Sequence, residues 1–156
     1  MIALGSALGT IEDVVDELRE DGVRIGALGI RTFRPWPQDE IRRALARARR
    51  VIVLEKALSI GIGGIVSQNV HRALEGLGID VHTAIAGLGG RPITKESLRR
   101  LFKDGIDGSL PDTTFVDLDH PLVDGEIQRM LRDRRSGPHA ENMLRDLRTV
   151  GASALT

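Results

Sequence analysis

The feature that most constrains the fold is a short apolar run that passes directly into charge and then into glycine. Residues 51–64 read VIVLEKALSIGIGG. Residues 51–54 are apolar and mostly β-branched, which favours a strand covered on both faces, as in a parallel sheet. Glu55 and Lys56 mark the exit from the core, and three glycines in residues 61–64 permit a tight turn into a helix. Because ligands and partners of open α/β sheets bind at this edge, we expect function to gather there.

The rest of the first two thirds of the chain repeats this alternation of strand and helix. Strands are predicted at residues 2–4, 24–30, 51–54 and 80–86, each followed by apolar residues at helical spacing. Thr10 and Thr94 are expected as helix N-caps, and Gly105 is expected to end the last helix. Strands that alternate with helices at this spacing predict a three-layer α/β/α domain around a mainly parallel sheet.

The character of the sequence changes after residue 105. Seven acidic residues occur between residues 104 and 126 without one Lys or Arg, and arginines then follow. Two apolar stripes at helical spacing accompany this change, one of Val123, Ile127, Met130 and Leu131 and one of Met143, Leu144, Leu147 and Val150. We therefore predict a folded domain over residues 1–105, and an acidic linker with a helical arm over residues 106–156. The exposed stripes are expected to pack on a partner or on a second copy, with Met130 and Leu131 at the contact.

Composition excludes several classes of function. The 156 residues contain 22 Lys and Arg against 22 Asp and Glu, so no global basic field favours nucleic acid or an anionic membrane. The absence of cysteine excludes disulfides, thiol nucleophiles and cysteine-ligated iron–sulfur clusters in this chain. No apolar run approaches the length of a membrane span, so we expect a soluble cytoplasmic protein.

One loop has the composition of a phosphate cradle. Gly5, Ser6, Gly9 and Thr10 lie between a predicted strand and a predicted helix, where backbone N–H groups bind phosphate. The spacing is G-x-x-x-G rather than the dinucleotide fingerprint, and Arg31 replaces the acidic residue expected after the second strand. A structural turn and a phosphate site both fit this loop. No pattern of catalytic or metal-ligating residues was found, so we predict no catalytic and no metal residue.

The turn at residues 31–37 reads RTFRPWP and concentrates the residue types that dominate interfaces. We predict that Arg31, Phe33, Arg34 and Trp36 form an intersubunit or interdomain contact, together with Glu55 and Lys56 after the third strand. An alternative stays open, in which the two aromatic side chains plug the end of the core.

The motifs taken together resemble a known family. Gly5-Ser6, Gly9-Thr10, residues 23–26, the RTFRPWP turn, residues 51–59 and residues 87–91 occur in order over residues 1–105. This arrangement is similar to the transketolase C-terminal-like domain, domain II, of the alpha subunit of the 2-oxoacid:ferredoxin oxidoreductases. Two positions depart from the family pattern, namely Pro92 after G-L-G-G-R and Ile60 in the central turn.

The resemblance implies a complex that oxidises pyruvate or 2-oxoglutarate with thiamine diphosphate, Mg²⁺, iron–sulfur clusters, coenzyme A and ferredoxin. It implies that this machinery lies in other domains or subunits, so the chain alone binds none of these cofactors and is not catalytic. It also implies an antiparallel edge strand preceding Met1, with residues 2–4 and 51–54 central in the sheet. The chain is thus expected to be a structural, subunit-docking domain or small subunit of the oxidoreductase complex. Pairing of the chain with itself, as a homo-oligomer, stays open as well. Two alternatives stay open: a stand-alone nucleotide- or phosphate-binding module, and the C-terminal domain of another thiamine enzyme such as a transketolase.

Overall fold

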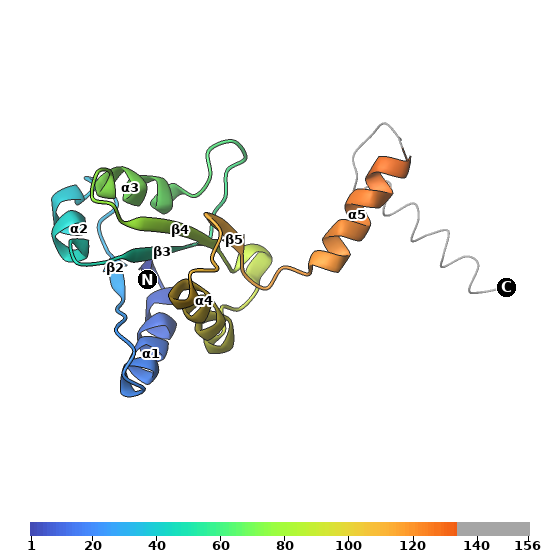
Figure 1. The fold of residues 1–156 in the computed structure, drawn as a ribbon. Helices are drawn as coiled ribbons and strands as arrows, with labels where there is room; N and C mark the ends of the chain where they lie inside the picture. Colours follow the sequence, from blue (N-terminus) through green and yellow to red (C-terminus); the bar gives the residue numbers. More distant parts are fainter. Residues whose placement is uncertain (134–156) are drawn as a thin grey trace. The chain divides into compact units, whose positions relative to one another are not determined.

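The structure, a computed structural model, describes residues 1–133 of the chain and consists of two compact units, Met1–Asp117 and Leu118–Thr156 (Figure 1). The first unit contains β1 (Ile2–Leu4), α1 (Ala7–Glu20), β2 (Leu28–Ile30), α2 (Gln38–Leu45), β3 (Arg50–Glu55), α3 (Ile65–Leu74), β4 (Asp80–Ile85), the short 3-10 helix η1 (Leu88–Gly90), α4 (Lys95–Asp107) and β5 (Thr113–Phe115). The second unit contains α5 (His120–Asp133).

The first unit is built on one five-stranded parallel sheet with the strand order β2-β1-β3-β4-β5. Ile2 of β1 lies opposite Leu28 on one side and Val53 on the other, so β1 and β3 both occupy central positions as predicted. The predicted three-layer α/β/α fold is confirmed, because helices cover both faces of this sheet (Figure 1).

Each face of the sheet has its own hydrophobic core. The α1 and α4 helices cover one face and the α2 and α3 helices the other (Figure 1). Side chains of β3 alternate between the two cores: Ile52 and Leu54 pack with α1 and α4, whereas Val51 and Val53 pack with α2 and α3. The apolar run at residues 51–54 is therefore buried on both sides, as its sequence predicts.

The sheet extends past the predicted boundary at residue 105. β5 pairs in parallel with β4, and Leu110, in the turn that leads to β5, is buried in the core shared with α4. One of the acidic residues that suggested a solvated linker is held by the folded domain instead, since the Asp117 carboxylate accepts hydrogen bonds from Ser97 at 2.5 Å and Arg100 at 2.6 Å. The strand was missed because it is three residues long and begins with two threonines, too short for a visible alternation.

Three local predictions also differ from the structure. Thr10 is not an N-cap, because α1 already begins at Ala7 and Thr10 lies within it. Gly105 does not end α4, which continues to Asp107 and is closed by Gly108 in the left-handed conformation, at φ 77°. Gly105 instead allows close packing, since an added Cβ would lie 2.7 Å from Cδ1 of Ile52. Of the strand predicted at residues 24–30, only Leu28–Ile30 is extended and paired, beside β1.

Two other predictions about helices can be compared with the described residues. The Thr94 cap is confirmed, because its Oγ1 accepts a hydrogen bond from the Ser97 N–H at 3.1 Å. The first apolar stripe after residue 118 is helical as predicted, within α5, and the second stripe lies outside the described residues. Within residues 1–133, no helix combines the length and the apolar character that crossing a membrane requires.

Candidate functional site

The carboxyl end of β3 carries a buried acidic side chain that holds the start of α3. Glu55 is 3% exposed, and its Oε1 accepts a hydrogen bond from the Val66 N–H at 2.9 Å. Its other oxygen, Oε2, is buried and has no hydrogen-bond partner among the described residues. Burial raises the pKa of Glu55, and the backbone N–H groups of Val66 and Ile65 oppose that rise. The carboxylate therefore joins the end of a strand to the N-terminus of the next helix, where negative charge is favoured.

Gly64 is required for this close approach. A Cβ at position 64 would overlap Oε2 of Glu55 and would lie 2.5 Å from Oγ of Ser67. Both of these side chains are buried. The sequence predicted a turn at Gly64, and the Gly-Gly pair before a helical stripe was the signal for it. The sequence did not indicate that Glu55 and Ser67 pack against this glycine.

The segment between Glu55 and Gly64, which we call the β3–α3 loop, has a defined shape. Ser59 and Gly63 exchange two backbone hydrogen bonds of 2.9 and 2.7 Å. Gly61 and Gly63 have positive φ angles of 79° and 89°, which favour glycine. The hydrogen-bonded turn between them presents Ile60 and Ile62 at its tip.

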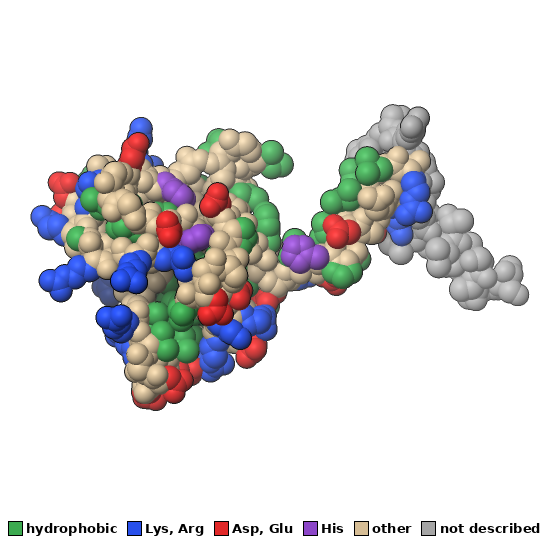
Figure 2. All heavy atoms as spheres, in the orientation of Figure 1, with side chains coloured by type: hydrophobic (Ala, Val, Ile, Leu, Met, Phe, Trp, Pro, Cys, Tyr) green, Lys and Arg blue, Asp and Glu red, His purple; other side chains and the backbone are tan. Residues whose placement is uncertain are grey.

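The tip of the β3–α3 loop is apolar and exposed. Ile60 is 100% exposed and Ile62 is 62% exposed. Figure 2 shows hydrophobic side chains at the end of the loop that projects from the upper part of the first unit, which is the β3–α3 loop of Figure 1. Exposed apolar side chains that lie together are typical of surfaces that contact a partner, because burying them is favourable.

The neighbouring loop after β4 lies beside the base of the β3–α3 loop. A Cβ at Gly87 would come 3.1 Å from Cε of Lys56, so the exposed Lys56 side chain runs along this second loop. The second loop also presents an exposed leucine, Leu88, and Arg91 ties it to the carbonyl of Asp117 at 3.0 Å. Of the predicted contact residues after β3, Lys56 is therefore on the surface, while Glu55 is buried and acts on the shape of the loop.

The RTFRPWP turn divides between core and surface. The rings of Phe33 and Trp36 meet edge to face with centroids 5.9 Å apart, and both pack against the core under α2 and α3. The Arg34 guanidinium lies 4.0 Å from the centre of the Phe33 ring. Arg31 and Arg34 are exposed. The aromatic pair thus packs as expected under the alternative in which Phe33 and Trp36 fill the end of the core. The two arginines remain on the surface.

The remaining predicted site residues belong to other segments of the chain. Gly5 and Ser6 precede α1, whereas Gly9 and Thr10 are inside it, so the four residues do not form one loop as predicted. No side-chain hydrogen bond caps α1 at Ser6. Met130 and Leu131 are exposed on α5, in the second unit.

Comparison with known proteins relates the first unit to one family. Residues 1–98 match the family model described as pyruvate:ferredoxin oxidoreductase core domain II. The chain is 40% identical over 112 residues to the pyruvate synthase subunit PorA of Thermotoga maritima, a match that covers 70% of this chain and 29% of that protein. It is 35% identical over 103 residues to the PorA subunit of Methanothermobacter thermautotrophicus, covering 66% of this chain and 26% of that protein.

A relative named for a different 2-oxoacid is also similar. The ketoisovalerate oxidoreductase subunit VorA of Pyrococcus horikoshii is 31% identical over 105 residues, covering 66% of this chain and 27% of that protein. The chain therefore spans about a quarter to a third of the length of these curated relatives.

Proposed function

The chain belongs to the 2-oxoacid:ferredoxin oxidoreductase family as a form of its core domain II, and on this premise we propose that it is a non-catalytic, subunit-docking domain of such an oxidoreductase. The proposed reaction of the assembled complex is the oxidation of pyruvate to an acyl-CoA with ferredoxin as electron acceptor. Pyruvate is favoured over 2-oxoglutarate because relatives with 35–40% identity are pyruvate synthase subunits.

One observation supports docking rather than catalysis, namely the β3–α3 loop. Its base is held by the buried Glu55 contact to Val66, while its tip carries the exposed Ile60 and Ile62. A fixed loop with an apolar tip loses little conformational entropy when a partner covers it, and its burial contributes favourable free energy. The exposed Lys56 and Arg34 provide charge at separate points of the same sheet edge.

The donor groups of this chain do not fit the cofactors of the whole complex. It contains no cysteine to ligate an iron–sulfur cluster. Among the described residues, no group of three or more His, Asp or Glu side chains is placed to hold a metal ion such as the Mg²⁺ of thiamine diphosphate. We therefore propose that the iron–sulfur clusters and Mg²⁺ are held by other domains or subunits of the complex. The same is proposed for thiamine diphosphate and coenzyme A, and the proposed location of the complex is the cytoplasm.

The first test is whether the isolated chain binds the thiamine cofactor. Titration calorimetry with thiamine diphosphate and Mg²⁺ is expected to give no binding heat, and an assay with pyruvate and ferredoxin is expected to give no turnover. Micromolar affinity for thiamine diphosphate in the purified chain would contradict the assignment of the cofactor to other subunits.

The second test is assembly. The purified chain is mixed with the thiamine-binding and cysteine-rich subunits encoded by the same organism, and the mass of the product is measured together with pyruvate oxidation. The variant I60S/I62S is expected to weaken assembly. Leu77→Ser is the matched control, because Leu77 is an exposed leucine outside these loops, in the turn between α3 and β4. Partner subunits that assemble and turn over at full rate without the chain would rule out the docking role.

A further inference from the structure

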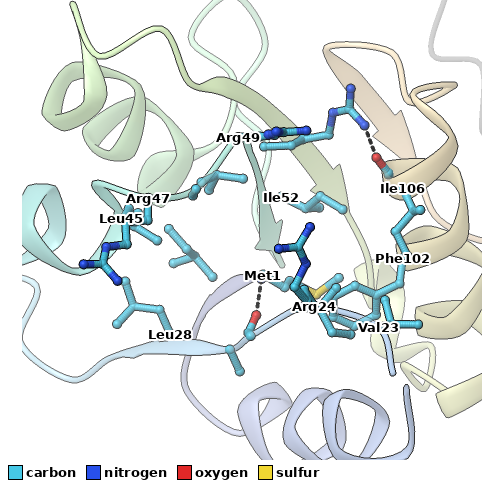
Figure 3. A pocket seen from close by; sticks show the side chains of 18 of the residues that line it. Met1, Val23, Arg24, Leu28, Leu45, Arg47, Arg49, Ile52, Phe102 and Ile106 are labelled. Atoms are coloured by element: carbon cyan, nitrogen blue, oxygen red, sulfur yellow. Dashed lines mark hydrogen bonds between the residues drawn. The ribbon is translucent and has the colours of Figure 1, made fainter. Parts of the chain in front are cut away.

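The opposite edge of the sheet, at the amino ends of the strands, contains a groove that the proposed function does not use. It has a volume of about 1110 Å³. Residues from three separate stretches line it, chiefly residues 22–28, 44–52 and 102–106, together with the first residues of β1. Figure 3 shows these side chains around an open space between β1, β3 and α4.

The charged lining of this groove has one sign. Five arginines line it, Arg19, Arg24, Arg47, Arg49 and Arg50, and no Asp or Glu does. Two of them have partners: Arg19 donates to the Ile25 carbonyl at 2.9 Å, and Arg50 donates to the Gly105 carbonyl and lies 3.8 Å from Asp80. The side chains of the other three make no hydrogen bond or ion pair with any described residue. The groove therefore has an uncompensated positive field, which favours an acidic occupant.

The groove also has apolar walls. Leu28, Leu45, Ile52, Phe102 and Ile106 are among its lining residues (Figure 3). Ile106 is 54% exposed there. The groove is open, and its arginines and apolar residues come from separate stretches of the chain, so it suits a polypeptide segment better than a phosphate or a nucleotide. Arginines around an apolar centre are also typical of protein interfaces.

α5 has the complementary pattern. It presents the exposed apolar side chains of Leu122, Ile127, Met130 and Leu131. Its first half carries Asp124 and follows Asp119, and residues 104–127 contain no Lys or Arg. The first half of the helix thus offers acidic charge beside apolar side chains, whereas Arg129 and Arg132 lie in its second half.

We propose that α5 of one copy of the chain docks into the arginine-lined groove of a second copy. The apolar stripe of the helix covers the apolar wall, and the acidic first half lies against Arg24, Arg47 and Arg49. A reciprocal exchange between two copies covers both grooves and both helices in one closed dimer. This inference does not depend on the proposed function, because it requires no other subunit.

The test measures the mass of the full chain by sedimentation velocity at micromolar concentration. At low ionic strength the mass of two chains is expected, and high salt is expected to shift it toward one chain because exposed charges are screened. The groove variant R24E/R47E/R49E and the helix variant D124R are each expected to be monomeric. Arg72→Glu, which reverses an exposed arginine on α3 outside the groove, is the matched control and is expected to keep the mass of the dimer.

Mixing the two reversed variants sharpens the test. Groove glutamates of one copy then face the new arginine on α5 of the other, and the unmodified groove of the second copy faces the acidic helix of the first. A 1:1 mixture is expected to regain the mass of two chains, with circular dichroism confirming that each variant is folded. A wild-type chain that stays monomeric at low salt overturns the proposal, even if it associates with partner subunits. A dimer that both reversals leave intact overturns it as well.

Discussion

The two edges of the sheet are built by different means. At the carboxyl edge, Glu55 and the backbone of Val66 hold the β3–α3 loop through a buried hydrogen bond, and glycines shape its tip. At the amino edge, Ile52 packs against Gly105, which in turn lies close to Leu110, and arginines surround this apolar contact. The stability of the carboxyl edge is therefore expected to depend on polar contacts and on pH. The stability of the amino edge is expected to depend on apolar packing, and its proposed association with a second copy on salt.

The largest expected effect of a substitution is at the amino edge. Leu110→Ala is expected to lower the free energy of unfolding by about 2–4 kcal/mol, because the side chain is buried in the core shared with α4 and its removal leaves a cavity. Denaturant unfolding measures the loss. The matched control is Ile106→Ala, since Ile106 is largely exposed in the groove and its loss is expected to cost much less. A loss for Leu110→Ala as small as that for Ile106→Ala would show that Leu110 does not stabilise the sheet.

The sequence predicted the strand, turn and helix of the carboxyl edge, although not the side-chain contacts of Glu55 and Ser67, and it did not predict the groove at the amino edge. Residues 51–64 lie together in the chain, so their buried run, charge and glycines predicted strand, turn and helix directly. The groove is assembled from arginines at positions 19, 24, 47, 49 and 50, which looked like ordinary solvated faces of separate elements. Their convergence depends on the strand order and on the length of β2, neither of which periodicity specifies.

The same limit explains the boundary that was placed too early. Acidic residues between 104 and 126 suggested one solvated linker, because composition does not distinguish a free carboxylate from one that is bound. Asp117 is bound to Ser97 and Arg100 across 20 and 17 residues of sequence, a contact that only the folded chain reveals.

At the carboxyl edge, the largest expected effect comes from Gly64. Gly64→Ala places a methyl group against two buried polar side chains, Glu55 and Ser67, and is expected to lower the free energy of unfolding by about 1–3 kcal/mol. Gly9→Ala is the control, because a Cβ at this position in α1 meets nothing within 4 Å. That control is expected to stabilise the chain by about 0.5–1 kcal/mol through its helix propensity. If both substitutions raised the unfolding midpoint, the close approach at Gly64 would not constrain the loop.

The pH dependence at this edge is expected to come from Glu55. Its folded-state pKa is raised above the unfolded value of 4.5, so between these two values the folded chain binds more protons than the unfolded chain. The free energy of unfolding therefore falls as pH rises through this window, by the linkage between proton binding and stability. Glu55→Gln removes the titration, keeps an oxygen for the Val66 N–H, and is expected to flatten this dependence.

The control for this measurement is Glu12→Gln, because Glu12 is exposed on α1. It is expected to retain the fall in stability with rising pH that the wild-type chain shows. Unfolding curves taken at a series of pH values compare the three proteins. A Glu55→Gln variant with the same slope as the wild type would mean that Glu55 titrates alike in both states.

The smallest expected effect concerns the RTFRPWP turn, where a cation and two aromatic rings are in contact. Arg34→Ala removes a cation 4.0 Å from the centre of the Phe33 ring and is expected to cost about 0.5–1 kcal/mol, as for exposed cation–π contacts. Trp36 contacts Phe33 edge to face, so its fluorescence reports the loosening. Acrylamide is the suitable quencher because it is neutral, whereas iodide would also respond to the lost charge. A small rise in quenching is expected for Arg34→Ala and none for Arg31→Ala.

The same measurement tests whether the turn is a contact surface. If it is, partner subunits added to the wild-type chain should lower the quenching of Trp36. Unchanged quenching in an assembled complex would mean that the aromatic pair only fills the end of the core.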